Sequence, residues 1–531
     1  MGSNPSAPRL NAKKGDRMSK TIIIIIFIFS TLFSADYSNI PLLKWAGPEG
    51  TRPKTYEEWI EQNPYTEFQC ILDKIVYGNG RAGNVAILTE QSIAGALTNG
   101  INQLISNLQL ENYTVLSYQI SGGTPETLRT FLQNLYNNNN IEGALFIGNL
   151  PVAWFEIAND YNQYGYAQFP IDLFYMDLNG TWLDTMNTGN GKYDGHTGNI
   201  NPEIYVGRLM TTGIGTDTVL LKNYFRKNNA YRYDTLSLQH RALVFCDDDW
   251  IPWAPQWAND VSVLYPDTMN YWHAETTRAS IYRTKLNTPE AWVALFAHSW
   301  PGGHQFRYNN GNSWDTYYSY EYTNQDPPAN FYNHFACSFA RYTDNGYGGG
   351  RAIFNQSYGL GAVGSTKTGS MLEFYYFYYP LSQHKTLGQA FKDWFTHITS
   401  DGVTFDELCW HYGMTLLGDP WLKPTGHGLA VAEYKKTIAG NSPIKIIGNL
   451  SRAQVIIKLK IEPSSSIRLD IYDCLGKKVK KLIDKTILSQ NDYEIIWHFD
   501  DDAGRQLPAG VYNVCAEIAG RKFMAKLVHL K

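Results

Sequence analysis

The sequence predicts an α/β protein, a parallel-sheet sandwich in two α/β subdomains, followed by a small all-β sandwich. Two observations support this class. Apolar strand-like runs alternate with helical stretches from residue 84 to about residue 425, which is typical of parallel strands covered on both faces. Beyond residue 430, short alternating strands are separated by Gly, Pro and Asp turns without a helical stretch.

The first subdomain is expected over residues 80–235 and the second over residues 236–425. Continuous apolar runs predict buried strands, and 3.6-residue periodicity predicts the helices between them. In order, strands are expected at 84–88, 114–118, 144–148 and 203–209, then at 242–245, 292–297, 331–336 and 358–363. The last domain, residues 430–531, is predicted to fold as a β-sandwich with a sorting or anchoring role.

Two of these strands end on reactive side chains. The run 292–297 leads into His298, and the run 331–336 leads into Cys337. If the strands are parallel neighbours, both side chains emerge at the same edge of the sheet. An imidazole beside a cysteine lowers the thiol pKa and later protonates the leaving amine. The pattern therefore predicts a cysteine hydrolase with a Cys-His dyad.

These residues are also compatible with other roles. His304, in the loop after the first strand, is a second candidate for the base or a pocket residue, because loops often carry such groups. His334 lies on the same strand as Cys337, three residues earlier, so alternation points it to the opposite face. Cys337 alone would also suit a buried core position.

Composition excludes several classes of function. The chain of 531 residues is 44% hydrophobic and 18% charged, which indicates a folded protein and argues against disorder. A net charge of −4 carries no nucleic-acid signature, and the spacing of the six cysteines contains no close pair typical of zinc sites.

The N-terminus predicts export. Residues 1–35 are interpreted as an extension and a signal peptide that starts at Met18, with an apolar core at 21–29 and small residues at 34–35. The apolar run ends near Phe33 and is shorter than the roughly 20 residues of a membrane-spanning helix. A secreted or surface protein without a stable transmembrane helix is expected, with a linker or prosegment at 36–79.

The two reactive strand ends resemble the gingipain-like cysteine peptidases of the caspase and legumain clan. Members show a hydrophobic block before His-Gly and a second block before Ala-Cys; here the matching dipeptides are His298-Ser299 and Ala336-Cys337. Similar family segments occur at 144–149, 205–209 (Tyr-Val-Gly-Arg-Leu) and 417–420 (Leu-Gly-Asp-Pro). The resemblance covers about residues 80–425 and implies a caspase-like fold.

The resemblance implies roles for particular residues. Backbone N–H groups of Cys337 and Ser299 would hold the oxyanion, and Asp249 would orient His298, although it also suits a loop carboxylate or a calcium ligand. If the family glycine is needed for a positive φ, Ser299 costs about 1 kcal/mol. Asp260, together with Trp300 and His304, would form the substrate pocket, although Asp260 is equally compatible with a solvated helix and Trp300 with simple packing.

A polar loop in the first subdomain suggests a structural calcium ion, since carboxylate and amide oxygens are the ligands that calcium prefers. The same pattern is also common in plain turns. No cofactor is expected for the chemistry itself. The candidate ligands are Asp177, Asn179, Asp184 and Asp194.

The tail over 497–512 and 526–531 resembles the immunoglobulin-like C-terminal domains that direct proteins to type IX secretion. The prediction is thus a secreted or surface cysteine endopeptidase that acts through an acyl-enzyme. Its expected partners are a protein or peptide substrate and the secretion machinery. The alternatives are a sortase-like transpeptidase of the same fold and a non-catalytic surface binding protein with a degenerate site, which the serine after His298 would favour.

Overall fold

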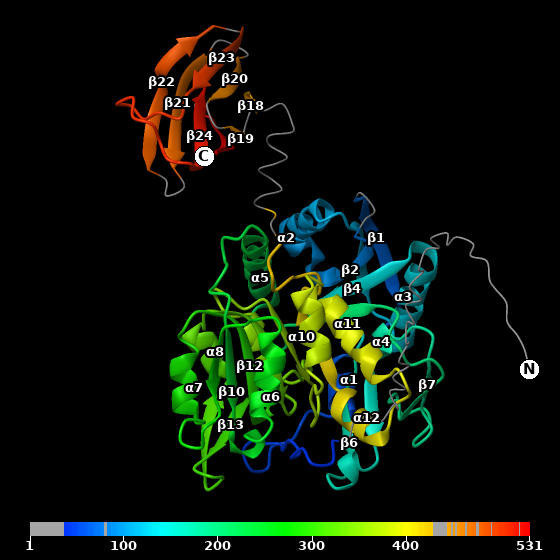
Figure 1. Ribbon diagram of the computed structural model, residues 1–531. Helices are drawn as coiled ribbons and strands as arrows, with labels where there is room; N and C mark the ends of the chain where they lie inside the picture. The colour runs from blue at the N-terminus through cyan, green and yellow to red at the C-terminus, as the bar shows by residue number, and fades with distance from the viewer. Residues whose placement is uncertain are drawn as a thin grey trace, which may run out of the picture.

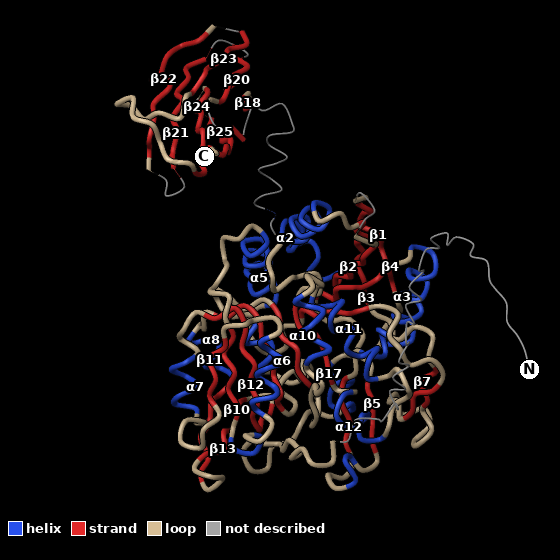
Figure 2. Tube along the Cα trace, viewed as in Figure 1, coloured by secondary structure: helices blue, strands red, loops and turns tan. Residues whose placement is uncertain are grey.

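The computed structural model describes residues 37–78, 82–427, 429 and 443–530, the last range with gaps at 448–449, 452–453, 462–464, 474–476, 490 and 520. The predicted signal peptide lies outside the described residues. Figure 1 and Figure 2 show the arrangement of helices and strands.

A single large sheet organises residues 69–418, so the two predicted subdomains share one sheet. Its strands in spatial order are β1 (Gln69–Val76), β3 (Thr114–Ser121), β2 (Asn84–Glu90), β4 (Ile141–Ile147), β9 (Tyr205–Leu209), β17 (Met414–Gly418), β16 (Gly361–Ser365), β15 (Ala329–Ala336), β12 (Glu290–Trp300), β10 (Ala242–Cys246) and β11 (Thr268–Tyr271). A hairpin of β13 (Gly303–Tyr308) and β14 (Ser313–Tyr318) continues from β12.

The sheet is mixed, which corrects the expectation of a parallel sheet. Strands β2, β3, β4 and β9 pair in parallel, as do β10, β11, β12, β15 and β16. β17 joins the two sets because it runs parallel to β9 and antiparallel to β16. The two halves therefore run in opposite directions, a feature that apolar runs alone do not encode.

Two segments that resemble family motifs meet at this junction. Leu417 of β17 pairs with Arg208 of β9. Gly207 lies so close to β17 that an added Cβ would stand 2.5 Å from the carbonyl oxygen of Gly418. Arg208 donates to Asp172 at 2.6 Å, and both side chains are buried. These motif residues therefore hold the halves of the sheet together.

Helices cover both faces of the sheet. Alternate residues of β12 enter opposite cores: Trp292, Ala294 and Phe296 enter one, and the intervening residues enter the other. The first core receives α3 (Pro125–Asn139), α4 (Leu173–Met176), α6 (Ala254–Ser262), α10 (Tyr375–Ser382), α11 (Leu387–Ile398) and α12 (Phe405–His411). The second receives α1 (Tyr56–Gln62), α2 (Gln91–Leu110), α5 (Asp217–Arg232), α7 (Ala279–Lys285), α8 (Ser319–Gln325) and α9 (Gly348–Ile353).

The segment predicted as a linker or prosegment belongs partly to the fold. β1 forms the antiparallel edge of the large sheet against β3. Most of its side chains are exposed or half-buried, so the strand lacks the apolar run that reveals a buried strand. Before α1, residues 37–55 run across the body as a segment that we call the strap.

Smaller elements complete the body. A hairpin of β5 (Trp154–Ile157) and β6 (Ala167–Pro170) carries the short helix η1 (Asp160–Asn162), and a second hairpin joins β7 (Thr181–Leu183) to β8 (Gly195–Thr197). The short helix η2 (Asp248–Trp250) follows β10. The Asp247 side chain accepts from the Asp249 N–H and thereby fixes the start of η2.

The C-terminal residues form two β-sheets around a separate core. One sheet contains β18 (Ile444–Ile447), β20 (Val455–Ile461) and β23 (Asn491–Trp497). The other contains β19 (Leu450–Ser451), β25 (Arg521–His529), β24 (Gly510–Ile518), β21 (Ser465–Asp473) and β22 (Lys478–Leu488). Buried residues alternate along β20 and meet Trp497 and Val514 in this core.

Candidate active site

His298 and Cys337 lie at the same edge of the sheet. β12 and β15 are parallel neighbours, and Ala297 pairs with Ala336, so the next residue of each strand is one of the two reactive groups. Both side chains are fully buried. The structure therefore brings together the two residues that the sequence selected.

His298 has a partner on each ring nitrogen. Its Nε2 lies 2.7 Å from Oδ2 of Asp249, and its Nδ1 accepts the backbone N–H of Lys44 at 3.0 Å. Burial lowers the pKa of His298, and the nearby Asp249 carboxylate only partly offsets this effect. The imidazole is thus held neutral, with its proton on Nε2 and a lone pair on Nδ1.

Asp249 is placed by the short helix η2 and is shared between two cationic or proton-donating groups. Oδ2 faces His298, and Oδ1 accepts from Nη1 of Arg307 at 2.5 Å. Burial alone would raise the pKa of Asp249, but the hydrogen bond from Nε2 of His298 and the charge of Arg307 outweigh it and lower the pKa. Arg307, on β13, was not identified from the sequence, since no local pattern connects it to Asp249.

The Cys337 thiol lies among hydroxyl groups. Its Sγ is 3.1 Å from Oγ1 of Thr368 and 3.7 Å from Oγ of Ser338. Burial raises the pKa of Cys337, although the two hydroxyls and Lys367 counteract part of the rise. Ser338, directly after the thiol, has a φ of 53°, so the backbone turns sharply at the nucleophile. Cys337 is held here as a protonated thiol.

Ser299 adopts an ordinary strand conformation, which removes the expected strain. It is absent from the non-glycine residues with positive φ and pairs within β12 and β13. Its Oγ lies 2.8 Å from Nδ1 of His304 and donates to the carbonyl of Ala297 at 3.2 Å. The backbone at this position therefore does not require a glycine, and the serine hydroxyl has polar partners in the core.

The three predicted pocket residues do not converge. His304 is fully buried beneath the strand, where Nε2 lies 3.1 Å from the hydroxyl of Tyr322. Trp300 packs against Tyr318, and Asp260 lies on α6 with its Oδ1 accepting from Gln256. Burial raises the pKa of Asp260 to about 6.

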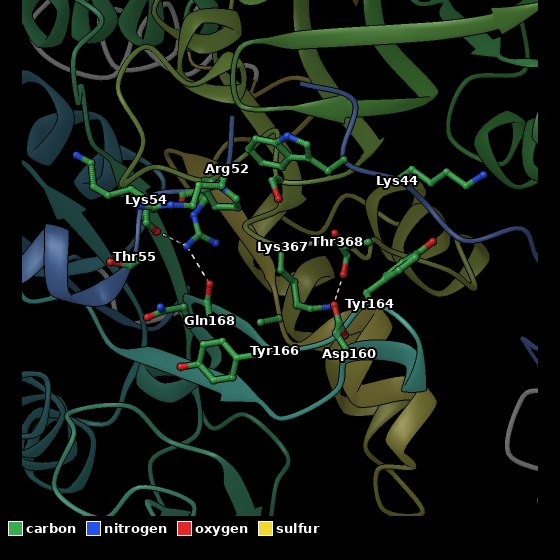
Figure 3. A pocket seen from close by; sticks show the side chains of 15 residues that line it. Lys44, Arg52, Lys54, Thr55, Asp160, Tyr164, Tyr166, Gln168, Lys367 and Thr368 are labelled. Atoms are coloured by element: carbon green, nitrogen blue, oxygen red, sulfur yellow. Dashed lines mark hydrogen bonds and ion pairs between the residues drawn. The ribbon is translucent and has the colours of Figure 1, made fainter. Parts of the chain in front are cut away.

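A cavity of about 450 Å³ opens beside the nucleophile instead (Figure 3). One wall comes from the strap and includes Lys44 and Trp45. Lys367 reaches from the loop after β16 to Asp160 of η1, at 2.9 Å. The remaining lining residues are Arg52, Pro53, Lys54, Thr55, Tyr164, Tyr166, Ala167, Gln168, Ser338, Arg341 and Thr368.

The strap crosses the site through backbone hydrogen bonds. Besides the Lys44 N–H on His298, the Ala46 N–H donates to the Ser299 carbonyl at 3.1 Å, and Trp45 and Ser299 form a parallel bridge. The Leu43 carbonyl accepts from the hydroxyl of Tyr164 at 3.1 Å. The Leu43 side chain is 1% exposed, so the strap fills space next to the dyad.

The strap is anchored at both ends of this crossing. The indole N–H of Trp250 donates to the Pro41 carbonyl at 2.8 Å, and Nη2 of Arg341 donates to the Lys54 carbonyl at 2.8 Å. The sequence contains only the weak signal of an apolar Pro-Leu-Leu stretch at 41–43, which does not reveal its docking place.

The four candidate calcium ligands point to different partners. The buried Asp177 carboxylate binds Arg129, His196, Trp182 and the N–H groups of the following turn. Asn179 donates to Glu203, Asp184 accepts from Gly189, and Asp194 accepts from Thr185. Within the described ranges, no three His, Cys, Asp or Glu side chains gather as a metal-binding group. This arrangement does not fit a shared calcium ion, and calcium stays a prediction.

The fold and the paired strand ends define an α/β protein with a cysteine and a histidine at one sheet edge. A family model described as peptidase family C25 matches residues 81–425. The chain belongs to this family and is a cysteine-type peptidase, a hydrolase whose substrates are proteins or peptides.

Comparison with solved structures gave matches of low sequence identity. The chain is similar to the Arg-specific cysteine proteinase gingipain R (RgpB), with 12% identity and a TM-score of 0.46 over 84% of this chain and 98% of that chain. The complex of Porphyromonas gingivalis RgpB pro- and mature domains matches with the same identity and TM-score over 84% of this chain and 100% of that chain. PorZ, a type IX secretion component of the same bacterium, matches with 15% identity and a TM-score of 0.14 over 23% of this chain and 14% of that chain. No curated protein matches the chain.

Proposed function

We propose that this peptidase is an exported endopeptidase that cleaves peptide bonds through Cys337 and His298. The observation that carries the proposal is the register of β12 and β15, which puts the two residues side by side. Asp249 supports it, because a carboxylate on Nε2 keeps the proton there and leaves the lone pair on Nδ1 to act as the base once the Lys44 N–H has moved away.

The chemistry follows from these positions. Nδ1 of His298 takes the thiol proton, and the Cys337 thiolate forms a bond to the substrate carbonyl carbon. The resulting oxyanion is held by the N–H groups of Cys337 and Ser299. His298 then returns the proton to the leaving amine as the peptide bond breaks. Water attacks the acyl-enzyme, releases the second product and restores the thiol.

The strap makes the described state latent. The Lys44 N–H occupies the nitrogen that would accept the thiol proton, and Cys337 has no exposed surface. We therefore propose that residues 37–55 act as an inhibitory prosegment within the predicted stretch 36–79. Catalysis requires the strap to leave His298, by displacement or by proteolysis.

The pocket preference is a separate proposal. A carboxylate matches a guanidinium fork well, so Asp260 would favour a basic residue before the cleaved bond if it faced the substrate. Its 9% exposure shows that α6 or its neighbours must shift before Asp260 contacts a substrate. Asp260→Ala should then weaken the labelling by Arg and Lys probes without weakening the labelling by Asn or Asp probes.

Export and surface attachment complete the proposal. It is supported by the predicted signal peptide from Met18 and by the resemblance of the tail to type IX sorting domains. In the described part of the chain, no helix has the length and apolar character needed to cross a membrane. Deleting residues 430–531 should retain the peptidase inside cells of a bacterium with type IX secretion, whereas unchanged export would reject the sorting role.

The dyad is tested with acyloxymethyl ketone probes that carry Arg, Lys, Asn or Asp at the first position. We expect one probe to label the full chain once the strap is displaced, and the label to disappear in Cys337→Ala and His298→Ala. Product that forms only with an added amine would favour a transpeptidase. Absence of labelling after limited proteolysis would contradict the proposed function.

A further inference from the structure

The β13–β14 hairpin folds back over the carboxylate that contacts His298. The Gly311 N–H, at the hairpin tip, donates to Asp248 at 3.0 Å. Arg307 donates through Nε to the Gly311 carbonyl at 3.1 Å, so its guanidinium is fixed relative to the tip. The hairpin tip is thus bound to η2 at Asp248, the residue before Asp249.

Arg307, Asp249 and His298 form a continuous chain of hydrogen bonds. Nη1 of Arg307 lies 2.5 Å from one oxygen of Asp249, and Nε2 of His298 lies 2.7 Å from the other. The Arg307 guanidinium also lies 5.8 Å from the centre of the Trp314 ring, which is itself 5.7 Å from the His298 ring. One hairpin therefore contributes both a cation and an aromatic wall next to the histidine.

We infer that Arg307 is a positioning residue of the peptidase: it holds one oxygen of Asp249 and thereby fixes the other on Nε2 of His298. The inference rests on the proposed function of the dyad. Without Arg307, the carboxylate is free to rotate about its side-chain bonds and to leave the imidazole. His298 would then lose the orientation that Asp249 imposes on its ring.

The guanidinium also has an electrostatic effect with a definite sign. A cation near an imidazole disfavours the imidazolium form and lowers the pKa of the imidazole. The charged groups that act on the His298–Asp249 pair are Arg307 from β13 and Lys44 from the strap, and the neighbouring carboxyl groups of Asp247 and Asp248 act on Asp249. Removal of Arg307 takes away one positive charge, which alone would raise the pKa of His298. When Asp249 also leaves Nε2, the larger raising effects of its hydrogen bond and its charge are lost, so the pKa of His298 should fall.

The test is hydrolysis of fluorescein-labelled casein by the full chain, with Lys44→Pro in every variant so that Nδ1 is not occupied. We expect Arg307→Gln to lower kcat on the order of 10-fold with little change in KM, since a hydrogen bond to a charged group is lost. The acid limb of kcat/KM should move to lower pH, because His298 loses the Asp249 carboxylate that raises its pKa. Arg307→Lys keeps the positive charge. The acid limb of its kcat/KM profile should stay at the pH of the parent, while its kcat should be partly lost.

Arg278→Gln is the matched control. Arg278 lies over Tyr308 of the same hairpin, at 4.6 Å from the ring centre, and its ion pair is with Glu275. This variant should keep the parent pH profile. If Arg307→Gln keeps the pH profile and the kcat of the parent, the positioning role of Arg307 is overturned, while the proposed function stands. If the parent, after limited proteolysis that removes the strap, hydrolyses casein no faster than Cys337→Ala treated in the same way, the proposed function is overturned, and the inference with it.

Discussion

The latent state can be tested by removing one backbone hydrogen. Lys44→Pro eliminates the N–H that donates to Nδ1 of His298, because proline has no amide hydrogen. Lys44→Ala is the matched control, since it removes the same exposed side chain and retains the N–H. A difference between the two variants reports on the hydrogen bond and on the proline backbone rather than on the lysine charge.

The size of the effect follows from the contacts of the strap. Four hydrogen bonds hold residues 41–46 on the site, through the Pro41 and Leu43 carbonyls and the Lys44 and Ala46 N–H groups. One such bond contributes about 1 kcal/mol net, which corresponds to roughly a 5-fold change in the population with the strap released. Adding Ala46→Pro removes a second bond, and the two effects should not add fully because the residues are neighbours.

The assay is the rate at which iodoacetamide alkylates Cys337 in the full chain, read by peptide mass. Cys337 is fully buried, so labelling requires release of the strap. We expect Lys44→Pro to react roughly 5-fold faster than Lys44→Ala, and the double proline variant to react faster still. Equal rates in Lys44→Pro and Lys44→Ala would refute the reasoning that the Lys44 amide restrains the dyad.

Three further outcomes are expected. Burial raises the pKa of Cys337 above its usual 9.0, so its alkylation rate in the unaltered chain should keep increasing through pH 9, and a plateau near neutral pH would contradict this. Asp419→Asn should lower the free energy of unfolding in urea by about 3 kcal/mol, because Arg232 is fully buried and pairs with Asp419 at 2.6 Å. The control is Asp393→Asn, which should have little effect because Asp393 pairs with Lys385 on the exposed surface. Asp177→Asn should lower the melting temperature equally with calcium and with a chelator, since Asp177 binds Arg129 and His196, whereas a loss seen only with calcium would support a calcium site.

Part of the candidate site could be predicted from the local pattern of apolar residues in the sequence. An apolar run of β-branched and aromatic residues marks a buried strand, and the residue that follows it stands at the sheet edge. That rule selected His298, which lies just past the last residue of β12 that pairs with β15, and Cys337, which directly follows β15. Asp249 was expected from the family resemblance instead, and in the structure it lies in η2 and contacts His298.

The contacts between segments far apart in the sequence could not be predicted from local patterns. The Lys44 amide meets a histidine 254 positions away, and Arg307 meets Asp249 across a separation of 58. β1 carries mostly exposed or half-buried side chains, and β17 reverses direction relative to β16 without a local signal. His304, selected from its loop, lies in the core because β13 turns it under β12.

The sequence by itself determined the α/β class of the body, the strand ends that carry the thiol and the imidazole, and membership of peptidase family C25. These properties depend on residue periodicity and on short motifs, which act over a few positions along the chain. Only the tertiary structure decided the junction at β17, the strap on His298 and the Arg307 contact with Asp249. The physical reason is that strand direction and docking are set by which buried surfaces fit together, and a linear pattern of apolar residues is compatible with more than one such fit.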